Sequence, residues 1–217
     1  MDLAPSLLSA NMLNLENELN ALVKSNVKYL HIDVMDGSFV PNMGFGPTMV
    51  KDIKNNFELI LDCHLMTNKP ENLVELFATA GADIITVHAE ATQHIYHVIQ
   101  KIKSLGCKAG IAINPGTPVT YIAPLLNIVD LVLVMTINPG ISAQEFIADT
   151  IDKVSELVYI RTSKNYNFLI EVDGSVSNKT IGFCKGIDIA VAGRYIFNGD
   201  IAMNVQSLIK ESELAWK

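Results

Sequence analysis

Eight short apolar runs, rich in Val, Ile and Leu, recur along the chain and constrain its fold more than any other feature. Runs that are apolar on both faces are typical of strands buried in a parallel sheet. The stretches between them carry apolar residues at helical spacing, such as Ile95, Val98, Ile99 and Ile102. The expected strands are Leu3–Leu8, Lys28–Val34, Glu58–His64, Asp83–His88, Lys108–Ile113, Asp130–Thr136, Asn167–Val172 and Ile187–Ala192.

Eight alternating strands and helices with right-handed crossovers close into a (β/α)8 TIM barrel. An open, doubly wound sheet is the alternative, but no G-x-G-x-x-G pattern follows the first apolar run. The 217 residues are 49% hydrophobic, which is enough for one large core, and no linker or low-complexity tract interrupts them. We therefore expect a single (β/α)8 barrel domain spanning residues 1–217.

The net charge, the first residues and the cysteines argue against several kinds of partner and location. The net charge of −7, without a stripe of Lys or Arg, argues against a nucleic-acid partner. The first residues lack the basic and apolar regions of a signal peptide, and no apolar stretch approaches the ~20 residues that a membrane span needs. The three cysteines lack metal-site spacing and suit reduced core thiols. We expect a soluble, cytoplasmic protein that contacts neither nucleic acid nor membrane.

Four side chains with metal-binding chemistry fall at the carboxyl ends of three expected strands. His31 and Asp33 lie on one face near the end of the second run, His64 ends the third, and Asp173 follows the seventh. Polar residues at the strand carboxyl ends of such a barrel form its active face. We expect all four to bind one divalent ion, with Zn²⁺ the first candidate and Fe²⁺, Mn²⁺ or Co²⁺ also compatible with this mixture of imidazole and carboxylate.

A divalent ion beside two carboxylates indicates proton transfer next to a carbonyl group. Asp33 and Asp173 would serve as the two acid–base groups, one removing a proton and the other returning one across a planar enediolate. Met35, Met66 and Met135 each lie beside a strand end, where they could line the site and exclude water.

Three glycine-containing corners follow the last three expected strands. Loops at these positions of a barrel commonly bind phosphate through backbone N–H groups. The corners predict a phosphate site made from Gly140, Ile141, Ser142, Ala143, Gly174, Ser175, Gly193 and Arg194.

Several segments of the chain resemble the ribulose-phosphate 3-epimerase family, and the resemblance runs from Ala4 to about Phe197. The most specific of them extends from His31 to Asn42. The segments are Pro5-Ser-Leu-Leu-Ser-Ala10, His31-Ile-Asp-Val-Met-Asp-Gly-Ser-Phe-Val-Pro-Asn42, Asp62-Cys-His-Leu-Met66, Val87-His-Ala-Glu90, Asn114-Pro-Gly-Thr-Pro118, Met135-Thr-Ile-Asn-Pro-Gly140 and Glu171-Val-Asp-Gly174.

The resemblance implies a metal-dependent isomerase of the pentose phosphate pathway that interconverts D-ribulose 5-phosphate and D-xylulose 5-phosphate. By the family pattern, His31, Asp33, His64 and Asp173 match the metal ligands, and Ser6 and His64 match substrate contacts. The three methionines match the family's site lining, and the glycine corners its phosphate site. The family also forms homodimers and hexamers, so the resemblance implies a homo-oligomer.

Two departures from the family pattern leave the substrate open. The family loop after the sixth strand usually reads Gly-Phe-Gly-Gly-Gln, but here it reads Gly140-Ile-Ser-Ala-Gln144. A small residue usually follows the glycine after the eighth strand, but here it is Arg194, which could bind a phosphate or occupy the pocket. The sister family of D-allulose-6-phosphate 3-epimerases is the alternative, with the same chemistry on a six-carbon ketose. A non-catalytic sugar-phosphate-binding barrel is a further alternative.

Overall fold

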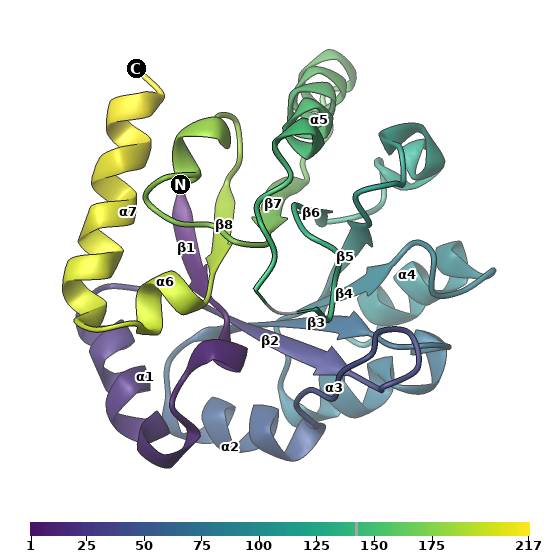
Figure 1. Cartoon of the computed structure of the whole chain (residues 1–217). Helices are drawn as coiled ribbons and strands as arrows, with labels where there is room; N and C mark the ends of the chain where they lie inside the picture. The colour runs from purple at the N-terminus through teal and green to yellow at the C-terminus, as the bar shows by residue number, and fades with distance from the viewer. Residues whose placement is uncertain (142) are drawn as a thin grey trace.

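The computed structural model describes residues 1–141 and 143–217, in which eight parallel strands form one sheet (Figure 1). Neighbouring strands pair in the order β1-β8-β7-β6-β5-β4-β3-β2. The predicted (β/α)8 barrel is confirmed. The strands are β1 (Asp2–Pro5), β2 (Tyr29–Met35), β3 (Ile60–Met66), β4 (Ile84–His88), β5 (Lys108–Ile113), β6 (Leu131–Met135), β7 (Leu169–Asp173) and β8 (Ile189–Ala192).

The barrel closes between β1 and β2, which are the two ends of the sheet order. Within the described residues, one isolated parallel bridge between Ser6 and His31 spans this seam, whereas each other neighbouring pair of strands shares a continuous ladder. Ser6 directly follows β1, and His31 lies on β2. The seam is therefore weakly hydrogen-bonded along the backbone. The side chain of Ser6 adds a hydrogen bond across it, to Asp33 on β2.

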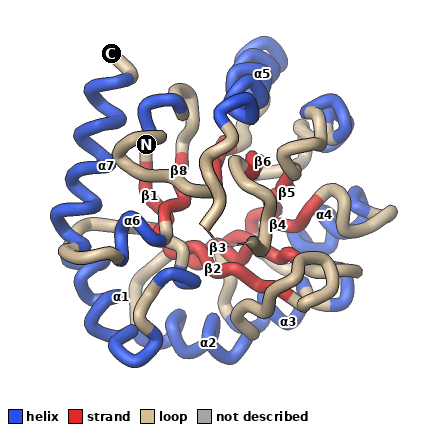
Figure 2. The backbone as a smooth tube through the Cα atoms, in the orientation of Figure 1, coloured by secondary structure: helices blue, strands red, loops and turns tan. Residues whose placement is uncertain are grey.

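Helices surround the strands on the outside of the barrel, as the blue and red segments of Figure 2 show. Among the described residues, none of these helices combines the length and apolar character needed to cross a lipid bilayer. The α-helices are α1 (Leu15–Lys24), α2 (Pro47–Asn56), α3 (Val74–Ala80), α4 (Ile95–Ser104), α5 (Ile151–Lys164), α6 (Arg194–Phe197) and α7 (Ile201–Ala215).

Short 3-10 helices replace the expected α-helices after β5 and β7. Pro118 and Pro124 lie in the first of these connections, and proline removes the backbone donor that a helix interior needs. The 3-10 helices are η1 (Leu7–Ser9), η2 (Met12–Asn14), η3 (Pro70–Asn72), η4 (Val119–Tyr121), η5 (Ala123–Leu125), η6 (Ala148–Thr150) and η7 (Ile181–Phe183).

The first predicted strand is wrong at its end. It was expected to continue to Leu8, but β1 stops at Pro5 because the chain turns into η1. The other seven strands lie within two residues of their predicted bounds.

Two apolar layers hold the barrel together. The larger layer packs the outer face of the strands against the helices, and includes Leu61, Phe77 and Ile99. The smaller layer fills the barrel interior, with Leu133 and Val191 among its members. Toward the carboxyl ends of β2, β3 and β7 the inward-facing residues become polar, so the apolar interior forms the base of the candidate site.

Candidate metal centre

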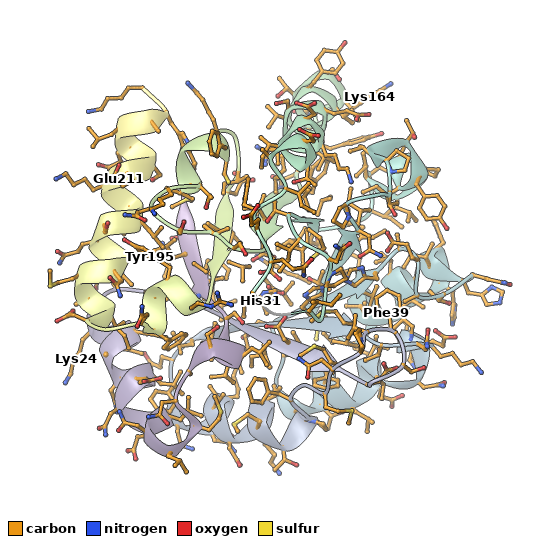
Figure 3. All side chains as sticks on the ribbon, in the orientation of Figure 1. Lys24, His31, Phe39, Lys164, Tyr195 and Glu211 are labelled. Atoms are coloured by element: carbon orange, nitrogen blue, oxygen red, sulfur yellow. The ribbon has the colours of Figure 1, made fainter. Side chains whose placement is uncertain are left out.

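The four predicted ligands converge at the carboxyl end of the barrel. His31 and Asp33 come from β2, His64 from β3 and Asp173 from β7. One ligand atom from each residue can be chosen so that all four atoms lie within 4.8 Å of one another. Figure 3 places His31 near the centre of the barrel, whereas Lys24 lies on an outer helix. Inward-facing positions on separate strands thus produce one compact cluster.

The distances within the cluster suit a small divalent cation. His31 Nε2 lies 3.3 Å from His64 Nδ1, and each of these nitrogens lies 3.6 Å from Asp33 Oδ1. His31 Nε2 lies 3.9 Å from Asp173 Oδ2. Ligands about 2.0–2.2 Å from a tetrahedral Zn²⁺ stand roughly 3.3–3.6 Å apart, so three of these separations fall in that range and the fourth slightly exceeds it. These four residues therefore fit a small divalent metal ion.

Asp62 orients His31. Its Oδ2 lies 2.7 Å from His31 Nδ1, and its Oδ1 accepts a hydrogen bond from Thr86. A carboxylate at this distance holds one imidazole proton on Nδ1, so Nε2 faces the cluster and is the nitrogen that would bind an ion, with release of any proton it carries. The sequence reasoning missed this role of Asp62, although Asp62 and His64 are two positions apart on β3 and share its inward face.

On the side of His64 that faces away from the cluster, hydrogen bonds connect His64 to His88 and His88 to Glu90. His64 Nε2 lies 2.8 Å from His88 Nε2, and His88 Nδ1 lies 3.3 Å from Glu90 Oε2. Burial lowers the pKa of His64, and it lowers the pKa of His88 to about 4, which favours the neutral form of both rings. Burial alone would raise the pKa of Glu90, but hydrogen bonds from His88, Thr117 and a backbone N–H lower it to about 2.

Opposing effects on the pKa values reveal a concentration of negative charge. Burial alone would lower the pKa of His31, but Asp62 and Asp33 outweigh burial and raise it well above its usual range. Burial alone would raise the pKa of Asp33, but hydrogen bonds from His31 and His64 depress it far below its usual range. Burial is the main reason why the pKa of Asp173 rises to about 7, and the nearby Asp33 and Asp62 add to the rise. A cation at this point would relieve the repulsion between these carboxylates.

A further carboxyl group lies next to the cluster inside the barrel. Glu171 is wholly buried on β7, and its side-chain oxygens have no hydrogen-bond partner among the described residues. Burial and the neighbouring Asp62 raise its pKa well above the usual range, which favours the protonated, neutral form.

A pocket of about 670 Å³ opens above the metal cluster. Asp33 and Asp173 line it, whereas His31 and His64 are wholly buried. Ser142, which was predicted to bind phosphate, lies outside the described residues. The other predicted contacts that line the pocket are Ser6, Met35, Met66, Met135, Gly140, Ile141, Ala143, Gly174, Ser175, Gly193 and Arg194.

The apolar part of the pocket comes from the three predicted methionines. Met35, Met66 and Met135 are buried at the ends of β2, β3 and β6. Val40, from the loop after β2, packs with Met35 and Met66 in a small cluster. The same Val40 side chain sits against Gly140, where an added Cβ atom would lie 2.3 Å from it. The loops after β2 and β6 therefore meet beside the site.

The predicted phosphate corners lie on another wall of the pocket, and side chains fix their conformation. Gln144 accepts hydrogen bonds from Asn138 and donates to the carbonyl oxygens of Asn138 and Ile141, which closes the loop after β6. Ser175 donates to the carbonyl oxygen of Gln144 and so joins the corners after β6 and β7. Ala143 has a φ of +61°, a left-handed conformation that glycine adopts more easily.

A second positively charged side chain beside the pocket, Lys179, was not predicted from the sequence. Lys179 lines the pocket together with Arg194, and neither side chain forms an ion pair with a carboxylate in the described part of the chain. Lys179 lies six residues after the end of β7, so it does not belong to the polar residues at strand ends from which the site was predicted.

Comparison with known proteins decides the family. The sequence model described as the ribulose-phosphate 3 epimerase family matches residues 2–197. The chain belongs to this epimerase family. It is 43% identical to the ribulose-phosphate 3-epimerase of Treponema pallidum over 201 residues, which cover 92% of each chain. It is also 43% identical to the Bacillus subtilis enzyme over 197 residues, covering 89% of this chain and 91% of the relative. The Escherichia coli K12 enzyme is 38% identical over 199 residues, covering 90% and 88%.

Solved structures support the barrel fold of this epimerase family member. The 3-keto-L-gulonate-6-phosphate decarboxylase of Vibrio cholerae superimposes with a TM-score of 0.73 at 19% identity, covering 100% of this chain and 99% of the other. A KGPDC structure from Streptococcus mutans in complex with D-R5P gives a TM-score of 0.74 at 16% identity with the same coverage. At this identity, the likeness concerns the fold alone.

Proposed function

We propose that this chain is a metal-dependent isomerase that interconverts D-ribulose 5-phosphate and D-xylulose 5-phosphate. Its membership of the family and the names of its relatives support the reaction class. The observation that carries the proposal is the convergence of two imidazoles and two carboxylates at the base of an open pocket. This set provides both a cation site and two groups able to carry a proton.

Asp33 and Asp173 are the proposed acid–base pair. They reach the pocket from β2 and β7, so their carboxylates approach a bound ketose from different parts of the barrel mouth. One would remove the proton from C3, and the other would return a proton to the opposite face of the planar enediolate, which inverts the configuration. A bound divalent ion, held by His31, Asp33, His64 and Asp173, would stabilise the negative charge that develops on the substrate oxygens.

The buried methionines and Ser6 support this chemistry. Met35, Met66 and Met135 present apolar surface to the pocket, which keeps water away from the reacting carbon. Ser6 donates a 2.6 Å hydrogen bond to Asp33 Oδ2, so one oxygen of that carboxylate is held in place. We propose that Ser6 also contacts the substrate.

The phosphate group would occupy the wall formed by the corners after β6, β7 and β8. Backbone N–H groups near Gly140, Gly174 and Gly193 are the proposed donors, together with the predicted contacts Ile141, Ser142, Ala143 and Ser175. Arg194 adds a positive charge to this wall, and Lys179 adds a second. Because the whole chain has a net charge of −7, two positively charged side chains beside one pocket favour an anionic substrate.

We propose Zn²⁺ as the native ion, because two imidazoles and two carboxylates at these separations suit it; Fe²⁺, Mn²⁺ and Co²⁺ remain compatible with the same donors. We also propose that the enzyme works in the cytoplasm, in the pentose phosphate pathway, as a homo-oligomer. Leu13 is completely exposed, and Leu8 and Met12 in the same segment after β1 are partly exposed, which supports a contact between subunits.

A side-by-side NMR assay tests the proposed function. The purified, metal-loaded protein is incubated in D2O with ribulose 5-phosphate and, separately, with allulose 6-phosphate. We expect deuterium to enter C3 and xylulose 5-phosphate to accumulate in the first sample, with much slower turnover in the second. Faster turnover of allulose 6-phosphate would identify the sister activity instead. Tight binding of either sugar phosphate without deuterium exchange would identify a binding protein.

A further inference from the structure

A line of buried hydrogen bonds leads away from His64 on the side opposite the metal cluster. His64 Nε2 lies 2.8 Å from His88 Nε2, and His88 Nδ1 lies 3.3 Å from Glu90 Oε2. The two imidazoles are completely buried, and their planes lie 26° apart with the ring centroids separated by 4.9 Å. Phe39 covers the His88 ring at a centroid distance of 4.9 Å. Because the rings are buried, the direction of each hydrogen bond in this line depends on which ring nitrogen carries the proton.

Glu90 sets that direction. Its Oε1 accepts hydrogen bonds from the backbone N–H of Asn114 at 2.9 Å and from the Thr117 hydroxyl at 2.5 Å. A carboxylate is an acceptor only, so its other oxygen must accept from His88 Nδ1–H. A neutral His88 with its proton on Nδ1 carries a lone pair on Nε2. That lone pair must accept from His64 Nε2–H, which leaves His64 Nδ1 unprotonated and facing the metal cluster.

We propose that Glu90 and His88 are positioning residues that fix His64 in the tautomer able to bind the metal ion through Nδ1. The proposal rests on the metal site of the proposed function, but not on the identity of the substrate. His31 is oriented by a shorter route, since Asp62 contacts its Nδ1 directly and Nε2 therefore faces the cluster. The two histidine ligands thus present opposite ring nitrogens, and each has its own carboxylate on the far side.

The substitution Glu90→Gln should reverse the line of hydrogen bonds. The two donors from Asn114 and Thr117 would hold the amide oxygen on their side, which turns the amide NH2 toward His88 Nδ1. His88 would then carry its proton on Nε2 and donate it to His64 Nε2. His64 would be forced to carry its proton on Nδ1, where the ion should bind.

Substitutions of His88 separate hydrogen bonding from packing. In His88→Gln, the side-chain amide oxygen can lie near the former Nε2 position, where it can accept the hydrogen bond from His64 Nε2–H. In His88→Leu, the buried His64 N–H loses its acceptor although the apolar contacts with Phe39 remain. If His88 acted only through packing, these two variants would affect metal binding equally.

The test measures the affinity for Co²⁺ by titration of visible absorption and locates the His64 proton by long-range ¹H–¹⁵N NMR of the apoprotein. We expect the unmodified apoprotein to carry the His64 proton on Nε2. Glu90→Gln and His88→Leu should bind Co²⁺ about 10–100-fold more weakly, with His88→Gln nearer to the unmodified protein. The exposed substitutions Glu75→Gln and His97→Gln serve as matched controls and should leave the affinity unchanged.

Three results would overturn the proposal. The first is a His64 proton on Nδ1 in the unmodified apoprotein, and the second is a Co²⁺ affinity of Glu90→Gln within about twofold of the unmodified value. The third is equal loss in His88→Leu and His88→Gln. Should Glu90→Gln fail to fold, the NMR result and the His88 pair still decide. These readouts do not involve sugar turnover, so failure of the epimerase assay would be seen separately.

Discussion

Ser6 Oγ donates a 2.6 Å hydrogen bond to Asp33 Oδ2, and this bond crosses the seam at which the barrel closes. The backbone contributes one parallel bridge at the same level, between Ser6 and His31. A single residue after β1 therefore contacts, through its backbone and its side chain, the two β2 residues that form half of the candidate metal centre. Closure of the fold and orientation of the site depend on the same position.

The substitution Ser6→Ala should lower kcat/KM roughly tenfold, because a hydrogen bond to a charged group contributes about 1.5–3 kcal/mol and part of it is replaced by substrate or water. Steady-state kinetics with ribulose 5-phosphate measures the change. The metal content should remain at one ion per chain, since Ser6 is not a proposed ligand. A variant with full activity would show that Asp33 does not need this donor.

The substitutions Asp33→Asn and Asp173→Asn should each reduce the interconversion of the two pentulose phosphates by at least about 10²-fold, because each removes a group that carries the proton. Coupled kinetic assays and metal analysis should be run together, since both residues are proposed ligands. The exposed substitution Asp52→Asn on α2 is the matched control. Retention of more than a tenth of the activity by either site variant would contradict the two-carboxylate mechanism.

Removal of the ion by a chelator should inactivate the enzyme, and restoring Zn²⁺ or Co²⁺ should recover the activity. The substitution His64→Ala should lower the bound metal below one ion per chain, because it removes one of four ligands. Elemental analysis of dialysed protein measures both effects. If His64→Ala retained a full equivalent of metal, His64 would not be a ligand.

The substitution Arg194→Ala should raise KM for ribulose 5-phosphate about tenfold with little change in kcat, because the side chain would bind the phosphate equally in the ground and transition states. Inorganic phosphate should also become a weaker competitive inhibitor. Lys185→Ala, an exposed substitution after η7, should alter neither value. An unchanged KM in Arg194→Ala would mean that the side chain points away from the bound substrate.

The substitution Gly174→Ala should destabilise the protein by about 1–3 kcal/mol or more, because its φ of +130° is unfavourable for alanine. The added Cβ atom would also lie 2.7 Å from the backbone nitrogen of Ile137. Gly116→Ala is the control, since nothing lies within 4 Å of its added Cβ atom. Thermal unfolding should show a lower Tm for the first variant and a nearly unchanged Tm for the second.

The periodicity of the sequence was sufficient to predict the barrel and the convergence of the four ligands. Alternation along β2 placed His31 and Asp33 on one face, and the common direction of parallel strands placed His64 and Asp173 near them. Whether these four residues hold the ion remains a prediction. The same alternation could have identified Asp62, whose inward position was available from the sequence.

Other features depended on contacts that no local pattern encodes. The pairing of His64 with His88 joins residues 24 positions apart, and Lys179 reaches the pocket from a connection without an α-helix. Leu13 is apolar like the buried Leu19 and Leu22 of the first helix, but α1 begins at Leu15 and Leu13 is completely exposed. Tertiary context decides such cases, because helical spacing alone does not fix where a helix begins.

The position of the seam has a consequence for folding. Three of the four candidate ligands come from β2 and β3, at one edge of the sheet order, and Asp173 comes from β7, near the other edge. An ion bound by all four would hold the two edges of the sheet together where the backbone provides little pairing. Metal binding would then stabilise the closed barrel as well as form the reactive site. The backbone amides of β1 and β2 would therefore exchange with solvent more slowly in the metal-loaded protein than in the apoprotein.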